Sequence, residues 1–243
     1  MEGITGLTEY SGSDKLWQQA IRKADASSNP DAIQIISPYR GEFYGTGALN
    51  TLMQSEFNPY WSHRYNLDGI SFFDKVIQFR NRPKSDMAYA YNQETRAVEQ
   101  HEVFNGEIGL VLMHPFDVKN KRYNYISTIE RFQVAFSNKS RQKLRYNYGR
   151  EYGKNEKGWN LPEQKVQENL ELSYAISVHK SQGSEFDYVY IVIPKRDSHL
   201  LSMELLYTAI TRAQKKVTIL LQEDIGTLTS LGHIEKSAVR RIN

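Results

Sequence analysis

The chain has 243 residues, a formal net charge of +3 and no cysteine. Without a thiolate, disulfide bonds and cysteine metal sites are excluded. A hydrophobic content of 40% and a charged content of 24% predict a globular protein of one large domain, or of a medium domain with an insert. No apolar run approaches the roughly 18 residues of a membrane span, and the N-terminal residues lack the pattern of a secretory signal. We therefore expect a cytoplasmic protein with no membrane partner.

The first part of the chain predicts an α-β-α order. Helical spacing of apolar residues indicates a helix over Asp14–Ala24 and a second helix over Thr46–Phe57, which ends at Asn58 and Pro59. A buried strand is expected between them, at Ile33–Ser37. The stripe that the second helix is expected to bury comprises Leu49, Leu52, Met53 and Phe57.

From about Phe72 the pattern changes to short alternating runs, which is typical of a small antiparallel sheet. The dipeptide Asn105-Gly106 predicts a type I′ hairpin turn within 103–108, because both residues tolerate positive φ angles. Alternation over 132–136 and 144–148 predicts half-buried strands. Six tyrosines in this part of the chain are interleaved with basic residues and could stack on bases, although packing explains most of them: Tyr89, Tyr91, Tyr123, Tyr125, Tyr146 and Tyr148.

The last part of the chain again predicts strands and helices in alternation. Apolar runs at 172–178, 189–193 and 217–221, with a helix over 205–212, indicate a parallel sheet covered by helices on both faces. We therefore expect one α/β domain made of residues 1–70 and 170–243. A small β-barrel at residues 71–150 interrupts this domain, and polar residues 150–169 form a linker.

A polar loop between two of the predicted buried strands is the first candidate site. It carries hydroxyl, imidazole, ammonium and amide groups on Ser177, His179, Lys180 and Gln182, followed by Gly183. In an open parallel sheet, ligands bind beyond the carboxyl ends of the strands, so these groups stand where chemistry is expected. Composition alone is equally compatible with a solvated connecting loop.

Arg212, near the end of the predicted helix, is the second candidate. Its guanidinium could complement the helix dipole or pair with a surface acid, which is the commoner role of a lone arginine. It could instead reach a cleft and bind phosphate oxygens as a planar fork.

The two stretches together resemble motifs V and VI of superfamily 1 DNA helicases, in the RecD-like branch of the exonuclease V alpha subunit. The matching residues are SVHKSQGSEFD, starting at Ser177, and LLYTAITRAQKKVTIL, starting at Leu205. The segment IQIISPYRGEFYGTGALNTLMQSEFNP, from Ile33, resembles the opening of the second motor domain of that branch. The segments DKVIQFRN and VFNGEIGLV resemble its SH3-like insert. The resemblance thus implies a RecA-like domain 2A with an SH3-like β insert, domain 2B.

The resemblance also implies roles for individual residues. Arg212 is expected to contact the γ-phosphate of ATP as an arginine finger, which can raise a rate about 10³- to 10⁵-fold. Gly183 and Glu185 are expected to contact the nucleotide. Ser177, where threonine is more usual, and His179 are expected to contact the phosphate backbone of single-stranded DNA, and Lys180 is grouped with them.

Parts of a complete helicase motor are not recognisable in the chain. The only Gly-Lys pair, Gly153-Lys154, is followed by Asn155 and has no suitably spaced glycine before it, so a phosphate-binding P-loop is missing. An adjacent Asp-Glu pair that would hold magnesium is also missing, and no pattern predicts another metal site. The chain therefore resembles the C-terminal portion of an ATP-dependent helicase, with ATP and Mg²⁺ anchored mainly by a separate 1A motor domain.

We expect this portion to serve single-stranded DNA translocation and duplex unwinding, from 5′ to 3′ by family resemblance, and to be inactive as an ATPase alone. Expected partners are single-stranded DNA, the 1A domain in the same or a separate polypeptide, and further nuclease or helicase subunits. One alternative is a stand-alone module that binds single-stranded nucleic acid or a protein without turnover. Another is an RNA-directed relative.

Overall fold

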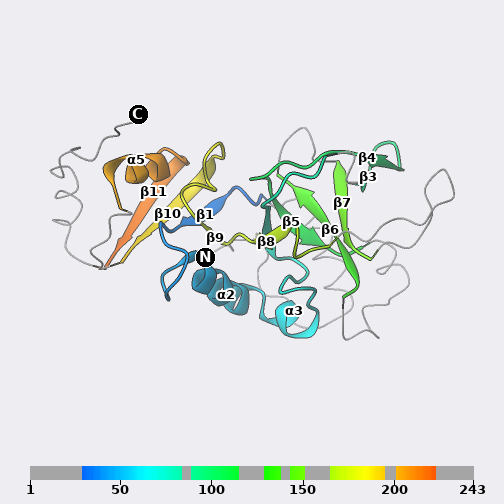
Figure 1. Ribbon diagram of the computed structural model, residues 1–243, viewed down its shortest axis with the longest axis horizontal. Helices are drawn as coiled ribbons and strands as arrows, with labels where there is room; N and C mark the ends of the chain where they lie inside the picture. The colour runs from blue at the N-terminus through cyan, green and yellow to red at the C-terminus, as the bar shows by residue number, and fades with distance from the viewer. Residues whose placement is uncertain are drawn as a thin grey trace, which may run out of the picture. The chain divides into compact units, whose positions relative to one another are not determined.

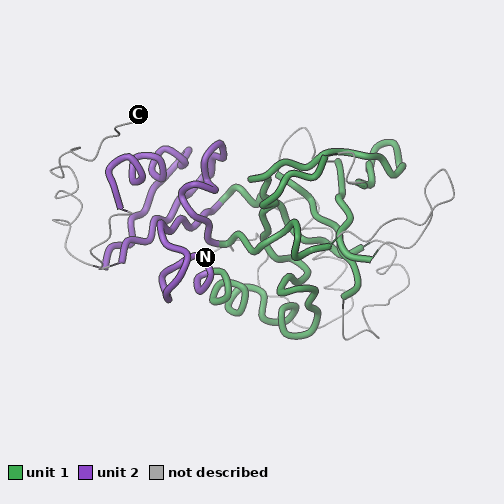
Figure 2. Tube along the Cα trace, in the orientation of Figure 1, with its two compact units in different colours: residues 1–32, 50–174 green, residues 33–49, 175–243 purple. Residues whose placement is uncertain are grey.

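A computed structural model describes residues 29–83, 89–114, 129–137, 143–150, 165–194 and 201–222. The chain divides into two compact units, which Figure 2 shows in different colours. Unit 1 comprises Met1–Ala32 and Asn50–Tyr174, and unit 2 comprises Ile33–Leu49 and Ala175–Asn243. No helix in the described ranges is both long enough and apolar enough to cross a membrane.

Unit 2 contains a four-stranded parallel sheet (Figure 1). Its strands lie in the order β11-β10-β1-β9, with bounds Ala213–Leu221, Phe186–Ile193, Ile33–Ile36 and Ala175–Ile176. Strand β1 pairs in parallel with β10 on one side and with β9 on the other. The predicted strands at residues 33–37, 189–193 and 217–221 and their parallel arrangement are confirmed.

Helix α5, Met203–Ile210, contacts strands β10 and β11. It begins at Ser202, whose side chain accepts a hydrogen bond from the backbone N–H of Leu205 and so satisfies one of the free donors of the first turn. Leu206 and Ala209, three residues apart, form its buried face. The predicted helix over residues 205–212 is thus present, but it starts earlier and ends before Arg212.

Unit 1 contains a seven-stranded antiparallel sheet with the strand order β4-β3-β7-β6-β5-β2-β8. The bounds are Lys75–Gln78 for β2, Tyr89–Asn92 for β3, Ala97–Gln100 for β4, Ile108–Leu112 for β5, Arg131–Phe136 for β6, Leu144–Gly149 for β7 and Leu170–Leu172 for β8. The predicted antiparallel sheet in the middle of the chain is therefore present. It also takes in β8, which was expected to belong to the α/β part.

The central strands of this sheet are buried on both faces. All six residues of β7 and five of the six in β6 are buried, so the prediction of half-buried strands was wrong. Trp61 from helix α3, Pro59–Arg64, joins the same core and packs edge-on against Phe73. Tyr146 and Tyr148 are fully buried and Tyr89 is nearly so. These three rings cannot stack on bases, while Tyr123 and Tyr125 lie outside the described residues.

Helix α2, Thr46–Phe57, forms where predicted and ends before Pro59, which starts α3. Its buried residue is Asn50, whose side-chain amide donates to the carbonyl of Leu172. Leu52 is half exposed, so the expected burial of the apolar stripe was wrong. A polar contact to β8, which sequence periodicity cannot reveal, orients this helix instead.

The Asn105-Gly106 turn differs from the predicted type I′ hairpin. Gly106 has a φ of 93°, but Asn105 is not among the residues with positive φ, whereas a type I′ turn needs both. The flanking residues also do not pair with each other, because Val103 bridges to Arg82 and Ile108 pairs with Ile77 of β2. The turn therefore connects two segments that both pair with the chain around β2.

The borders of the compact units differ from the predicted domain borders. Residues 29–32, 50–70 and 170–174 group with the antiparallel sheet in unit 1, although they were assigned to the α/β part. The packing of α3 onto the core of that sheet and the pairing of β8 with β2 account for the difference. The predicted helix Asp14–Ala24 and residues 151–164 of the predicted linker lie outside the described residues.

A buried carboxylate joins several elements of unit 1. Asp74 accepts hydrogen bonds from the side-chain amides of Gln54 and Asn58, from the backbone N–H of Ser71 and from the hydroxyl of Tyr174. Burial raises the pKa of Asp74 to about 6, although the four donors act in the opposite direction. The carboxylate thus ties α2, the start of α3 and the approach to β9 to strand β2.

Candidate functional site

The candidate loop, residues 177–185, connects two parallel strands of unit 2. It leaves the carboxyl end of β9 at Ser177 and enters the amino end of β10 at Phe186. Strands β9 and β10 flank β1 in parallel register, with Ile36 opposite both Ile176 and Ile191. The carboxyl ends of these parallel strands lie together on one side of the sheet, here called the carboxyl edge, and their amino ends lie on the opposite side, the amino edge. The loop therefore begins at the carboxyl edge and ends at the amino edge.

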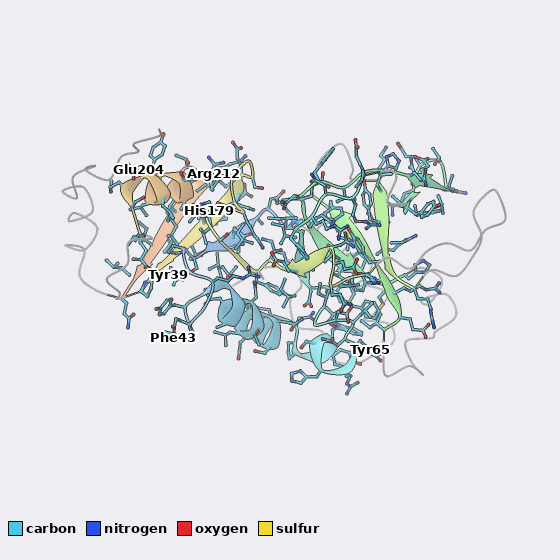
Figure 3. All side chains as sticks on the ribbon, in the orientation of Figure 1. Tyr39, Phe43, Tyr65, His179, Glu204 and Arg212 are labelled. Atoms are coloured by element: carbon cyan, nitrogen blue, oxygen red, sulfur yellow. The ribbon has the colours of Figure 1, made fainter. Side chains whose placement is uncertain are left out.

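Ser177, His179 and Lys180 follow the carboxyl edge. Ser177 Oγ accepts a hydrogen bond from the backbone N–H of Lys180, with a nitrogen-to-oxygen distance of 3.4 Å. The His179 side chain is exposed (Figure 3). Partial burial lowers the pKa of the Lys180 ammonium, and the positive charge of Arg40 lowers it further. Three polar groups and a nearby arginine therefore share this edge.

Buried Ser181 fixes the middle of the loop. Its backbone N–H bonds to the carbonyls of Ser177 and Val178, and its hydroxyl donates to the carbonyl of Val178 at 2.7 Å. Gly183 follows with a φ of 83°, and an added Cβ would meet no atom within 4 Å. Glycine is thus favoured by backbone conformation rather than by crowding. The open space beside it leaves room for a ligand to approach the backbone.

Glu185 lies at the amino edge beside the start of β11. Its carboxylate accepts a hydrogen bond from the side-chain amide of Gln214 at 2.7 Å. Asp187 forms an exposed ion pair with Lys215 at 3.0 Å, and this partner raises the pKa of Lys215. The first bond joins the end of the loop to β11 and the second joins β10 to β11, both at the same edge as Arg212.

Arg212 stands between the end of α5 and the start of β11. Its carbonyl accepts a hydrogen bond from the backbone N–H of Phe186, the first residue of β10, at 2.8 Å. Its guanidinium donates to the carbonyls of Thr208 and Ser184 and to the hydroxyl of Thr211. A guanidinium has five N–H donors, so two have no acceptor within the described part of the chain and are left for a further one. The guanidinium thus bonds both to a carbonyl of the last turn of α5 and to a carbonyl of the loop. The first of these bonds is the interaction with the helix terminus that the sequence suggested as one role of Arg212.

The predicted site residues therefore form two groups in unit 2. Glu185 and Arg212 lie at the amino edge of the sheet, whereas Ser177 follows its carboxyl edge. Arg40 and Gln214 were missed as neighbours of these groups. Arg40 follows β1, and only the parallel pairing of β1 with β9 brings it beside Lys180. In the described ranges, no group of three His, Cys, Asp or Glu side chains could hold a metal ion.

Residues 172–220 match the UvrD-like helicase C-terminal domain. This range contains the whole candidate loop, helix α5 and Arg212. The match covers the part of unit 2 in which the two groups of candidate residues lie.

The chain is also similar to longer curated proteins. It is 33% identical over 205 residues to an uncharacterized protein of Methanocaldococcus jannaschii, covering 80% of this chain and 15% of that protein. It is 49% identical over 55 residues to RecBCD enzyme subunit RecD of Mycobacterium tuberculosis, covering 23% of this chain and 10% of that protein. It is 27% identical over 189 residues to the ATP-dependent RecD2 DNA helicase of Deinococcus radiodurans, covering 77% and 20%. The chain thus spans a fifth or less of the length of these relatives.

Among solved structures, the chain is similar to the Pif1 helicase from Bacteroides in complex with ADP-AlF3 and ssDNA. The similarity covers 87% of this chain and 47% of that one, with 14% identity and a TM-score of 0.40. At this score and identity, the likeness supports no further inference.

Proposed function

This chain resembles the C-terminal part of RecD-like superfamily 1 helicases, and from that premise we propose that it is a portion of an ATP-dependent DNA helicase. Unit 2 would serve as the second RecA-like motor domain, and the antiparallel sheet of unit 1 as its SH3-like insert. One observation carries the proposal. Within the matched range, Arg212 donates to the carbonyl of Ser184 and so joins the two motif-bearing segments at one edge of a parallel sheet.

The amino edge is proposed to meet the nucleotide. Arg212 would contact the γ-phosphate of ATP through its two remaining N–H donors, and Gly183 and Glu185 would contact the nucleotide beside it. The open space at Gly183 and the fixed backbone of Arg212 support this assignment. ATP and Mg²⁺ would be anchored mainly by a partner 1A domain, and a bound magnesium ion would neutralise charge on the phosphates.

The carboxyl edge is proposed to meet single-stranded DNA. The Ser177 hydroxyl, the exposed His179 ring and the Lys180 ammonium would contact the phosphate backbone. Closing and reopening of the nucleotide cleft would then move these contacts along the strand. Translocation from 5′ to 3′, with duplex unwinding, is part of the same proposal.

The proposed enzyme needs partners beyond this chain. A 1A motor domain with a P-loop, on the same or a separate polypeptide, would supply the site for the triphosphate. The similarity to proteins named as RecBCD subunits supports further nuclease or helicase subunits as partners. Alone, the chain is expected to bind DNA but not to hydrolyse ATP. Phosphate release above background from the purified chain with single-stranded DNA would contradict this expectation.

Replacement of Arg212 tests the assignment of the nucleotide edge. In an enzyme assembled from this chain and a P-loop motor domain, Arg212→Ala should lower kcat for ATP about 10³-fold or more while DNA affinity is largely kept. Arg212→Lys keeps the charge but not the planar fork, so it should restore little. Lys216→Ala, an exposed change on β11, is the matched control and should leave kcat unaltered. An unchanged kcat for Arg212→Ala would refute the role.

Replacement of His179 tests the DNA edge in the same enzyme. His179→Ala should weaken DNA binding and DNA-stimulated ATP hydrolysis more than basal hydrolysis, because the exposed side chain lies in the part of the loop that follows β9 and is proposed to contact DNA. A greater loss of basal hydrolysis would mean that the functions of the two edges have been exchanged.

A further inference from the structure

The loop that follows β1, residues 37–45, lies beside the candidate loop that follows β9. The ends of the two strands are paired, since Ile36 is opposite Ile176 and the backbone N–H of Ser37 donates to the carbonyl of Ile176 at 3.0 Å. The two loops thus leave the same edge of the sheet as neighbours. A strand of nucleic acid held by one of them would pass close to the other.

Arg40 gives this loop a positive charge near Lys180. The Arg40 side chain is exposed, and in the described part of the chain its guanidinium forms no ion pair. Its charge acts on the Lys180 ammonium of the neighbouring loop and lowers the pKa of that group, after the larger effect of burial. Two cations that repel each other across adjacent loops would both be stabilised by a phosphate between them.

Phe43 gives the same loop an exposed aromatic ring. The residue is 74% exposed, which is high for so large an apolar side chain. Its ring packs edge-on against Tyr44 at 4.8 Å between centroids, and Tyr44 packs in the same way against buried Tyr39 at 5.3 Å. Figure 3 labels Phe43 and Tyr39 on this loop. The ring of Phe43 is therefore held in position by Tyr44, while much of its surface is exposed and could stack on a base.

The backbone of the loop is held in place before any ligand binds. The N–H of Thr46 donates to the carbonyl of Tyr39 at 2.9 Å, and the hydroxyl of Ser37 donates to the carbonyl of Tyr44 at 2.9 Å. A Cβ on Gly45 would collide with the carbonyl oxygens of Gly41 and Arg40. Because hydrogen bonds and close packing already order the loop, binding would cost little conformational entropy.

We propose that the 37–45 loop is a second contact site for single-stranded DNA, in which Arg40 binds a backbone phosphate next to Lys180 and Phe43 stacks on a base. The site rests on the proposed function, because it extends the same DNA path along one edge of the sheet, from the loop after β9 to the loop after β1. Glu42, in the same loop, carries a negative charge that should repel a phosphate. Removing this charge therefore tests whether electrostatic attraction contributes to binding at the loop.

Fluorescence anisotropy of a labelled oligothymidylate, titrated with the full chain over a range of salt concentrations, tests the site. Arg40→Ala should weaken binding and lower the log-log salt slope by about 0.7, the value for one phosphate of a single strand. Phe43→Ala should weaken binding about tenfold without altering the slope, as the loss of one stacked base predicts. Its effect should disappear on an abasic oligonucleotide. Glu42→Gln should tighten binding.

Two comparisons separate the possible outcomes. Arg80→Ala, an exposed arginine in unit 1, is the matched control and should leave affinity and salt slope unaltered. If His179→Ala weakens binding but the Arg40 and Phe43 variants match the wild type, the second site is refuted and the proposed function stands. If the wild-type chain does not bind the oligonucleotide, both are refuted. Equal thermal melting of the variants establishes that the changes act on binding rather than on folding.

Discussion

Tyr174 supplies one of the four hydrogen bonds that the buried carboxylate of Asp74 accepts. Tyr174→Phe removes the hydroxyl that donates to Asp74 Oδ1 at 2.9 Å and leaves the ring in place. A hydrogen bond to a charged group contributes about 1.5–3 kcal/mol. We therefore expect the free energy of unfolding of unit 1 to fall by about 2 kcal/mol at pH 7.5, where a carboxyl with a pKa of about 6 is ionised.

The loss should depend on pH. The pKa of Asp74 in the folded protein, about 6, lies above its ordinary value of 3.8, so the folded state binds an extra proton between these values. Stability from this group is therefore lost as the pH rises from about 4 to 6, by about 3 kcal/mol in total. At pH 4.5, well below the folded pKa of about 6, Asp74 is protonated in the folded protein, so the bond from Tyr174 reaches a neutral carboxyl and is worth about 1 kcal/mol. Tyr174→Phe should thus cost about half as much at pH 4.5 as at pH 7.5.

Urea unfolding at both pH values measures the effect. Fluorescence of Trp61, which lies in the core of unit 1, reports on this unit when Trp17 and Trp159 are replaced by phenylalanine. Glu56→Gln, which removes an exposed carboxylate from α2, is the control and should cost less than about 0.5 kcal/mol. Burial lowers the pKa of Lys75 to about 7, but this residue is present in both proteins and its effect cancels in the difference. An equal cost of Tyr174→Phe at both pH values would refute the ionised carboxylate.

Two further substitutions test local packing and capping. Gly109→Ala should destabilise unit 1 by about 3 kcal/mol in urea unfolding, because its Cβ would stand 2.6 Å from the carbonyl oxygen of Ala135. Gly106→Ala, with no atom within 4 Å and a φ of 93°, should cost only about 1 kcal/mol, and a reversed order of the two would contradict this account. Ser202→Ala should lower the stability of unit 2 by about 1 kcal/mol, as the loss of the α5 cap requires. The threonine variant should recover most of that loss in thermal melting, and no change for alanine would argue against the cap.

The parallel sheet of unit 2 was predictable because its strands carry continuous apolar runs. Val189 and Ile191 are buried on β10, and β1 pairs with the same strand over its whole length. For unit 1, the presence of an antiparallel sheet was predictable, but the burial of its central strands was not. Arg131 and Asn147 occupy buried positions on β6 and β7, so polar residues alternate along strands that are covered on both sides. Alternation was therefore mistaken for exposure to solvent.

The candidate residues could be named from the sequence, but their arrangement could not. Glu185 and Arg212 were proposed from the motif resemblance, whereas the bond that Arg212 makes to the Ser184 carbonyl depends on where β10 and β11 begin. Arg40 could not be identified, because its nearness to Lys180 follows from the pairing of two strands about 140 residues apart in the chain. Spacing in a sequence does not contain this kind of contact.

The bonding of Arg212 bears on how the two edges of the sheet could communicate. Three of its donors are used within unit 2, and the two that remain are enough for a phosphate oxygen. A phosphate could therefore bind without releasing Ser184 from the guanidinium. Ser184 lies seven residues after Ser177 in a loop whose middle is fixed by buried Ser181. A displacement of the guanidinium toward a nucleotide would thus be transmitted along a short, hydrogen-bonded segment to the residues proposed to hold DNA.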